Sequence, residues 1–477
     1  MSLKNKVLTG VKWVAFANIF RQILSLVSIA ILARLLSPDD FGIFAILMIL
    51  IGFLAIFSDM GTAPALIQME SPSNKLLSSV FYFNLFIGFI LSALLILFSK
   101  NIAIFFEDAR IENMIQLISI NFIIVSFGVV QKALFQKSIN FKHLSLVQSF
   151  AMFSGTAVGI TSAIYGLGVY SLIAQTLTSS ILGTGIIWFY SSWKPMWFFS
   201  FSEIKKIWRY TANFSIFSVI DYFAKETDNF LIGKYISTSA LGVYSLAYKI
   251  MLYPLQNITK TLISVLFPAF STLQNDNQKF KKVYLRVIFF IALISFPLMT
   301  GLMATSDVFV DVLFGDKWKG LAILIIILAP SGMLRSIFTT VGVILMAKGH
   351  TDTQLRLGAA NAILTVTGFI IGLNWGVEGI AFAYLIVNTI MLYPIFKFSW
   401  RHIELSVKDG LNEILPIFII SILMGLGVYL IDILLFIDIE SNLLRLFLMI
   451  ITGISLYTLM LRLYYGNLKT LVKELKN

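Results

Sequence analysis

The stretch DYFAKETDNFLIGKYISTSALGVYSLAYKIMLYPLQ, residues 221–256, decides how the rest of the chain is interpreted. It begins inside a long apolar segment, yet it carries four charged residues, Asp221, Lys225, Glu226 and Asp228. A charge near the centre of a bilayer costs roughly 2.5–3.5 kcal/mol on insertion scales, so it is rare there and usually marks a functional position. The stretch therefore predicts a membrane helix with an ionised face.

The same stretch repeats an earlier part of the chain. Residues 34–44 read RLLSPDDFGIF and residues 234–244 read KYISTSALGVY, so that Gly42 matches Gly242 at an offset of 200 residues. With an even number of spans in each copy, both copies begin on the same side of the membrane. The sequence thus predicts two parallel repeats, an arrangement typical of transporters.

The composition of the chain is that of a membrane protein. Of its 477 residues, 58% are hydrophobic and 13% are charged, whereas a soluble domain has about half and about a quarter. Apolar runs of about 20 residues recur along the sequence, which is the length that a helix needs to cross roughly 30 Å of hydrocarbon. The chain contains no cysteine, which excludes disulfides and thiol chemistry.

These runs predict an all-α polytopic membrane protein with about 14 transmembrane helices. The helices form two pseudo-symmetric six-helix lobes, related as a parallel repeat, and two further C-terminal helices. The predicted spans are residues 13–36, 41–66, 76–98, 112–132, 144–165, 169–191, 211–233, 238–262, 284–306, 320–346, 355–374, 376–397, 411–431 and 443–465.

Four segments follow from these spans. The N-terminal lobe takes residues 1–192 and the C-terminal lobe takes residues 211–400. Residues 193–210 form a cytoplasmic amphipathic linker, and residues 401–477 form the extra helix pair and a basic tail. Within the linker, residues 201–210 predict a short helix on the inner leaflet. An ordinary solvated loop is an equal alternative for this part of the linker.

The distribution of charge predicts the orientation. When both termini are placed in the cytoplasm, 24 of the 36 Lys and Arg residues fall on the cytoplasmic side and 7 fall on the outer side. This is the positive-inside pattern of multi-pass membrane proteins. It also accounts for the net charge of +12 without a nucleic-acid partner.

The seventh predicted span carries a polar stripe. On a helical wheel, Asp221, Lys225 and Asp228 fall within about 60° of each other, whereas Glu226 points away from them. The stripe predicts a wet cavity inside the bundle. The alternative is an internal ion pair between Asp221 and Lys225, which lie four residues apart and satisfy each other.

The first predicted span carries a stripe of matching phase. Arg21, Ser25 and Ser28 occupy the positions equivalent to the stripe of span seven, and Asn18 lies one turn earlier. Two stripes on symmetry-related helices predict one shared cavity, with Asn18, Arg21, Ser25 and Lys225 as substrate-binding candidates.

Two more cations lie within spans. Arg335 is in the middle of span ten and Lys249 is in the middle of span eight, with no obvious partner in its own helix. Because an unpaired buried cation is costly, each is predicted to meet water, an anionic ligand or a carboxylate of span seven. We therefore count both as substrate-binding candidates.

Other chemistries have no support in the sequence. The three histidines, His143, His350 and His402, fall in cytoplasmic loops without metal-ligand spacing, so we predict no metal site and no cofactor. No phosphate-binding loop of the kind that would bind a nucleotide is present. No loop is long enough for a folded catalytic domain, so the chain is not predicted to be an enzyme. Transport must then draw on an ion gradient or on the gradient of the substrate.

Several motifs resemble those of a known family. They are the run RLLSPDDFGIF at residues 34–44, SDMG at residues 58–61 with ALIQ after it, DNFLIG at residues 228–233, LGVYSLAYK at residues 241–249 and FPAFS at residues 267–271. Together they resemble Wzx-type flippases, especially the colanic-acid branch. These proteins belong to the multidrug/oligosaccharidyl-lipid/polysaccharide exporter superfamily.

The resemblance implies a substrate and a mechanism. The substrate would be a polyprenyl-pyrophosphate-linked oligosaccharide, moved by alternating access from the inner to the outer leaflet of the bacterial cytoplasmic (inner) membrane. A cationic cavity would accept the pyrophosphate. The acids Asp221, Glu226 and Asp228 depart from a purely basic cavity, and we regard them as candidates for coupling to H⁺ or Na⁺.

The resemblance also implies partners. We expect a monomer in contact with membrane lipid, with a polysaccharide polymerase and chain-length proteins as neighbours in the same process. The main alternative function is an ion-coupled exporter of small molecules or drugs on the same fold. It favours an acidic cavity, against which Arg335 argues.

Overall fold

A computed structural model describes the chain except for residues 1–2, 60, 139–140, 254–269, 271–272 and 467–477. Every regular element within the described residues is a helix. Contacts within the chain group these helices into two compact units, Met1–Gly242 and Val243–Asn477.

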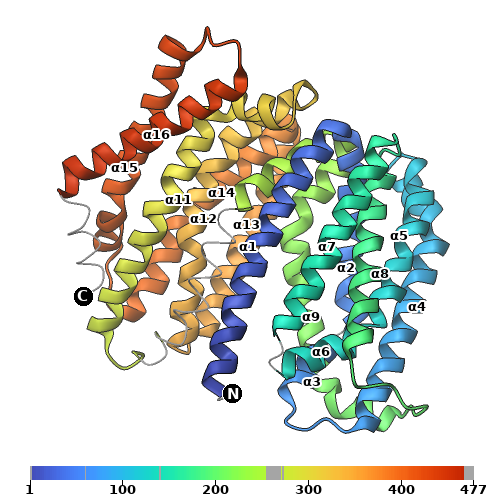
Figure 1. The fold of residues 1–477 in the computed structure, drawn as a ribbon. Coiled ribbons are helices and arrows are strands. Elements are labelled where there is room, and N and C mark those ends of the chain that lie inside the picture. The colour runs from blue at the N-terminus through green and yellow to red at the C-terminus, as the bar shows by residue number, and fades with distance from the viewer. Residues whose placement is uncertain (1–2, 60, 139–140, 254–269, 271–272, 467–477) are drawn as a thin grey trace. The chain divides into compact units, whose positions relative to one another are not determined.

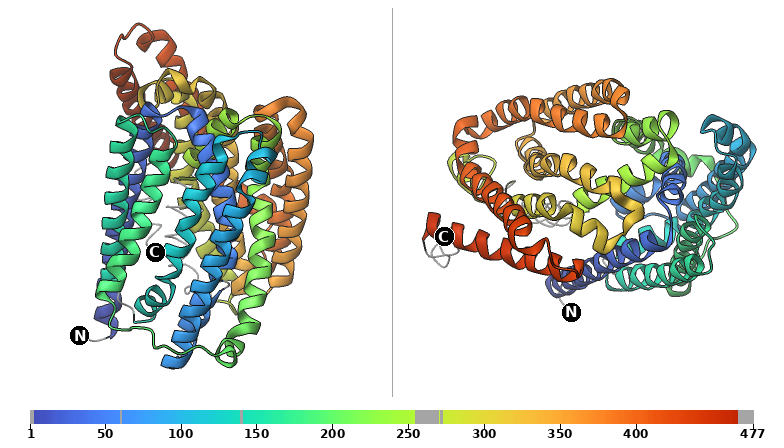
Figure 2. Two further views of the ribbon diagram at one scale, coloured as in Figure 1. Left: turned by 90° about the vertical axis from the view of Figure 1, so that its right-hand side faces the viewer. Right: turned by 90° about the horizontal axis from the view of Figure 1, so that it is seen from above.

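The first unit consists of nine labelled helices in the described residues. Figure 1 shows α7 and α8 side by side, the views of Figure 2 agree, and their residues pack closely. The helices are α1 (Leu3–Leu35), α2 (Pro38–Asp59), α3 (Thr62–Gln68), α4 (Asn74–Phe105), α5 (Arg110–Ser126), α6 (Val129–Lys137), α7 (Phe141–Ile164), α8 (Tyr170–Tyr190) and α9 (Phe201–Tyr235).

The second unit contains longer helices, in which α11 packs against both α12 and α15. A helix that begins at residue 238 continues into this unit and is described to residue 253. The other elements are α11 (Asn277–Leu313), η1 (Asp316–Trp318), α12 (Lys319–Ala347), α13 (Thr351–Gly372), η2 (Leu373–Trp375), α14 (Gly376–Trp400), η3 (Arg401–Ile403), α15 (Val407–Ile431), η4 (Asp432–Phe436) and α16 (Asn442–Tyr465).

Ten helices in the described residues are long and apolar enough to cross a membrane, and the bent pair α5 and α6 makes eleven. One of these ten apolar segments, Thr351–Ile403, contains two helices, α13 and α14. The charged helix α9 is not among them. The prediction of a polytopic all-α membrane protein is thus confirmed, whereas the number fourteen stays a prediction.

Two predicted spans are broken in the structure. The span predicted at 41–66 divides into α2 and α3, because Gly61 adopts a left-handed conformation with φ of 74°. The span predicted at 112–132 divides into α5 and α6, which meet at an angle of 44°. The apolar pattern runs through the second break, so hydrophobicity alone could not locate it, whereas Ser58, Asp59 and Gly61 interrupt the pattern at the first break.

Residues 201–210 are helical, but they do not form a separate short helix. They are the first turns of α9, which runs unbroken from Phe201 to Tyr235 and packs against α2, α3 and α4 of the first unit. The side chain of Ser200 caps its N-terminus by accepting a hydrogen bond from the backbone N–H of Ser202. The amphipathic pattern here therefore reflects packing on the unit's own core.

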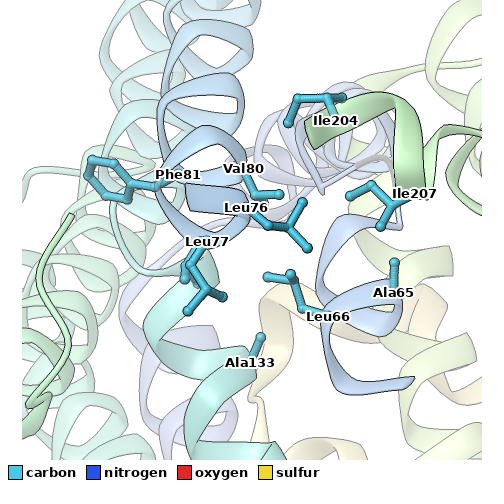
Figure 3. Packing of buried hydrophobic residues seen from close by; sticks show 10 residues of the cluster. Ala65, Leu66, Leu76, Leu77, Val80, Phe81, Ala133, Ile204 and Ile207 are labelled. Carbon is cyan, nitrogen blue, oxygen red and sulfur yellow. The ribbon is translucent and has the colours of Figure 1, made fainter. Parts of the chain in front are cut away.

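That core is the hydrophobic cluster of Figure 3. Leu66 of α3, Leu76 and Val80 of α4, Ala133 of α6 and Ile204 of α9 come together in it and are almost fully buried. Burial of large aliphatic side chains contributes roughly 1.5–3 kcal/mol each. The cluster fixes the two short helices α3 and α6 in place, and both of these helices also line the site described below.

The two repeated motifs meet in the first unit through their glycines. A Cβ on Gly42 would lie 1.7 Å from the carbonyl oxygen of Thr238, and a Cβ on Gly242 would lie 1.8 Å from that of Pro38. The contact is reciprocal, because Pro38 and Thr238 are themselves 200 residues apart. The glycines that the repeat aligns therefore allow two helix N-termini to touch backbone to backbone.

Charged residues surround this contact. Thr238 donates a hydrogen bond to Asp39, and Arg110 forms ion pairs with Asp39 at 2.7 Å and with Asp108 at 2.6 Å. Hydrogen bonds from Arg110 lower the pKa of the Asp108 carboxyl. Lys234 similarly pairs with Glu107 at 2.8 Å. These groups tie the loop between α4 and α5 to the start of α2 and the end of α9.

Candidate functional site

Arg335 forms the centre of a polar cluster in the second unit. It lies on α12, and its Nη1 donates hydrogen bonds to the hydroxyls of Tyr248, at 2.9 Å, and Tyr384 of α14. The two hydroxyl oxygens are 3.2 Å apart. We call Arg335, Tyr248 and Tyr384 the arginine–tyrosine cluster.

Aromatic packing fixes this cluster. The ring of Tyr244 stacks on Tyr248 with centroids 6.0 Å apart, and Phe369 stacks on Tyr384 at the same distance. The guanidinium carbon of Arg335 lies 5.8 Å from the centroid of the Tyr384 ring, which is within the range of a cation–π contact. The guanidinium thus has a defined position before any ligand arrives.

The partners of Arg335 are neutral. Among the described residues no carboxylate lies within ion-pair distance of it, and only its Nη1 donates hydrogen bonds to the protein. A guanidinium carries five N–H donors in a planar fork that suits carboxylate and phosphate. The cluster therefore offers an anion a positive charge and the guanidinium N–H groups that do not bond to the protein.

Arg21 is held in a similar way in the first unit. Its Nη1 donates to Gln148 Oε1 of α7 and its Nη2 donates to Asn18 Oδ1, three residues earlier on α1. Both partners are amides, and in the described part of the chain Arg21 has no carboxylate partner. The sequence placed Asn18 and Arg21 together, whereas Gln148 is a partner that the structure adds.

Gln148 also lines a pocket inside the first unit, which we call the N-terminal pocket. Its volume is about 480 Å³, and its walls come from α2, α3, α5, α6, α7 and α8. Three amides, those of Asn121, Gln136 and Gln148, line it together with the ammonium-bearing Lys132. No acidic residue is among the described side chains that line it.

The bend between α5 and α6 creates this pocket. Asn121 lies on α5 before the bend, and Lys132 and Gln136 lie on α6 after it. The carbonyl of Phe127, freed at the break, accepts a hydrogen bond of 2.7 Å from the indole N–H of Trp188. The carbonyl that the break frees thus finds a hydrogen-bond partner on α8.

The acids of α9 form a group of their own in the first unit. Asn229 donates through its side chain to Glu226 Oε2 and through its backbone N–H to Asp228 Oδ1, both at 2.8 Å. Asp228 is 2% exposed, and Glu226 is half-buried. Asp228 and Lys225 take part in further interactions. The side chain of Asp221 lies outside the described residues, so its pairing with Lys225 stays a prediction.

The remaining candidates are Lys249, Lys225 and Ser25. Lys249 follows Tyr248 on its helix and is exposed, as is Lys225 on α9, and Ser25 is half-buried on α1. Within the described residues no group of three or more His, Cys, Asp or Glu side chains could hold a metal ion.

Sequence reasoning missed Tyr384, Gln148, Asn121 and the role of Lys132. A signal was present for the amides, because Asn121 and Gln148 carry large polar side chains within predicted membrane spans, where polar groups usually have a function. Nothing comparable distinguished Tyr384 from the other aromatic residues of the chain.

Comparisons with known proteins relate the chain to proteins of polysaccharide biosynthesis. The model of a family described as "Polysaccharide biosynthesis protein" matches residues 31–323. The chain is 26% identical over 437 residues to the lipopolysaccharide biosynthesis protein WzxC of Escherichia coli (strain K12), with 89% of each chain covered. It is 26% identical over 434 residues to the teichuronic acid biosynthesis protein TuaB of Bacillus subtilis (strain 168), again with 89% of each covered.

The fold is similar to that of a solved flippase. With "Lipid II flippase MurJ, inward closed conformation", the TM-score is 0.77 at 18% sequence identity, and the match covers 95% of this chain and 99% of that chain. At this identity the similarity is one of fold.

Proposed function

This chain belongs to the polysaccharide biosynthesis protein family, and from that premise we propose that it flips lipid-linked oligosaccharide repeat units. The substrate is a polyprenyl-pyrophosphate-linked oligosaccharide, which moves from the inner to the outer leaflet of the bacterial cytoplasmic membrane for surface polysaccharide synthesis. Two relatives are named for the biosynthesis of lipopolysaccharide and teichuronic acid, and one solved structure of similar fold is a flippase.

One observation carries the proposal more than any other. Each unit contains a transmembrane arginine whose described hydrogen-bond partners are neutral, namely amides for Arg21 and phenols for Arg335. A structural arginine within a membrane would be expected to face a carboxylate, because an uncompensated charge is costly there. Neutral partners fix the guanidinium and leave its charge for a ligand such as a pyrophosphate.

The mechanism that we propose is alternating access. Two six-helix lobes of a fourteen-helix protein, with both termini in the cytoplasm, enclose the headgroup while the polyprenyl tail stays in the bilayer. Arg21 and Arg335 replace part of the hydration shell of the pyrophosphate, with Lys225 and Lys249 as further cations. Asp221, Glu226 and Asp228 are our candidates for coupling the cycle to H⁺ or Na⁺.

Complementation of a flippase-deleted strain tests this function. Arg335→Ala should abolish surface polymer although the protein still reaches the membrane, because the anion loses its fixed guanidinium. The amount of tagged protein in the membrane fraction serves as the check on insertion. Arg356→Ala is the matched control, since Arg356 is an exposed arginine near the start of α13. Normal surface polymer from Arg335→Ala would refute the anion-binding role.

The second candidate is an ion-coupled exporter of small molecules, and the buried Asp228 beside Glu226 is the observation in its favour. An exporter of cationic drugs would lower the sensitivity of a strain that lacks its own efflux pumps. We expect no such change, because the two arginines oppose a cationic substrate.

A further inference from the structure

The N-terminal pocket is lined by residues of α3 and α6 that neighbour the buried residues of the same two helices. Leu66 and Ala133 anchor these helices in the hydrophobic cluster of Figure 3, whereas Ile67 and Lys132 face the pocket. Its volume of about 480 Å³ falls within the range of small-molecule binding sites, roughly 300–1,000 Å³. The pocket therefore has walls held rigidly from behind.

The polar groups of the pocket suit a sugar. Amides and hydroxyls each donate and accept hydrogen bonds, as sugar hydroxyls do. Asn121 and Gln136 supply amides, and Ser58, Ser179 and Thr184 supply hydroxyls. The Oδ1 of Asn121 is buried without a hydrogen-bond partner among the described residues. Because an unsatisfied buried carbonyl is costly, a ligand hydroxyl that donates to it is favoured.

The charge of the pocket suits one acidic group. Lys132 is the one charged side chain among its described lining residues, and it makes no hydrogen bond or ion pair within the described part of the chain. Gln148 contributes its amide nitrogen, since its Oε1 already accepts from Arg21. One ammonium among neutral groups matches a sugar that carries a single negative charge.

We propose that the N-terminal pocket binds an acidic sugar of the repeat unit, with Lys132 as the partner of its carboxylate or phosphate substituent. Asn121 and Gln136 bond the hydroxyls of the same residue. This inference rests on the proposed function and refines it: the arginine–tyrosine cluster serves the pyrophosphate that every substrate carries, and Lys132 sets a preference among repeat units.

The test compares two flippase-deleted strains, one whose repeat unit contains a uronic acid and one whose repeat unit is neutral. Lys132→Gln should lower export of the acidic unit about tenfold more than export of the neutral unit, the loss expected for one charge-assisted hydrogen bond. Lys132→Arg should restore the preference. Arg335→Ala should lower export of both units equally.

Equal effects of Lys132→Gln on the two units, or no effect on either, would overturn the pocket assignment and leave the proposed function standing. Failure of the unchanged protein to export either unit would instead refute the proposed function.

A binding measurement distinguishes a sugar carboxylate from a phosphate as the ligand of the pocket. Saturation-transfer NMR on the purified full chain, with glucuronic acid, glucose and inorganic phosphate as probes, should show glucuronic acid bound most strongly. Lys132→Gln should abolish that preference and Arg335→Ala should preserve it. Phosphate displacing glucuronic acid at equal concentration would mean a phosphate site, which contradicts the sugar assignment.

Discussion

At the scale of single residues, hydrogen-bond partners decide what a transmembrane charge can do. Arg335 and Asp228 both lie within the predicted membrane region, but Arg335 meets phenols whereas Asp228 accepts a backbone N–H. Phenols orient a guanidinium without neutralising it. Its availability to an anion therefore depends on residues that carry no charge themselves.

Tyr384→Phe tests this dependence. It removes one hydroxyl that fixes the guanidinium of Arg335 while leaving the ring in place, so export should fall by roughly tenfold, the equivalent of one hydrogen bond to a charged group. The measurement is surface polymer per unit of membrane-inserted protein. Tyr393→Phe on the same helix is the control, because Tyr393 is 56% exposed and lies outside the cluster. Equal export by the two variants would contradict the orienting role.

At the scale of helices, local backbone features interrupt an otherwise uniform apolar pattern. The 44° bend between α5 and α6 opens the N-terminal pocket, and the reciprocal glycines let the start of α2 meet the helix that begins at residue 238. The bend lets polar side chains of α5 and α6 line one pocket. The glycines let two helix backbones approach more closely than residues with a Cβ would allow.

Gly42→Ala should destabilise the protein. The new Cβ would overlap the carbonyl oxygen of Thr238, which belongs to the backbone and cannot rotate away, so a loss of about 1–3 kcal/mol is expected from overpacking. Gly185→Ala is the matched control on α8, where a Cβ meets nothing within 4 Å. It should be neutral or stabilising by up to about 1 kcal/mol.

Thermal unfolding of the detergent-purified variants, followed by tryptophan fluorescence, measures both effects. An unchanged unfolding temperature for Gly42→Ala would show that the glycine contact is not close in the membrane protein.

At the scale of the whole molecule, the two repeats carry equivalent chemistry in non-equivalent surroundings. Each unit holds one arginine between neutral groups, but the partners are amides in one unit and phenols in the other. The repeat does not relate these two arginines, because its offset of 200 residues pairs Arg21 with Asp221 and Arg335 with Phe135. Each unit therefore carries its arginine at a different place in the repeat.

The predicted orientation can be tested on the whole chain, which has no native cysteine. Two single-cysteine variants are needed, Asp438→Cys and Thr351→Cys. Asp438 lies in the loop that follows α15 and η4, Thr351 begins α13, and both residues are exposed. A membrane-impermeant maleimide should label Asp438→Cys in intact spheroplasts and Thr351→Cys only after lysis, because the positive-inside pattern places residue 351 in the cytoplasm. The reverse pattern of labelling would invert the orientation and the direction of transport.

The sequence by itself determined the membrane-spanning helical class, the 200-residue repeat and the candidate cations, because hydrophobic length, periodicity and charge are local properties. It placed Asn18 beside Arg21, since three residues on a helix share a face.

Only the tertiary structure decided the partners of those cations. Gln148 is 127 residues from Arg21 and Tyr384 is 49 residues from Arg335, and such contacts follow from how helices pack rather than from local pattern. The bend that opens the N-terminal pocket is equally a tertiary property, because Trp188 of another helix satisfies the carbonyl that the bend sets free.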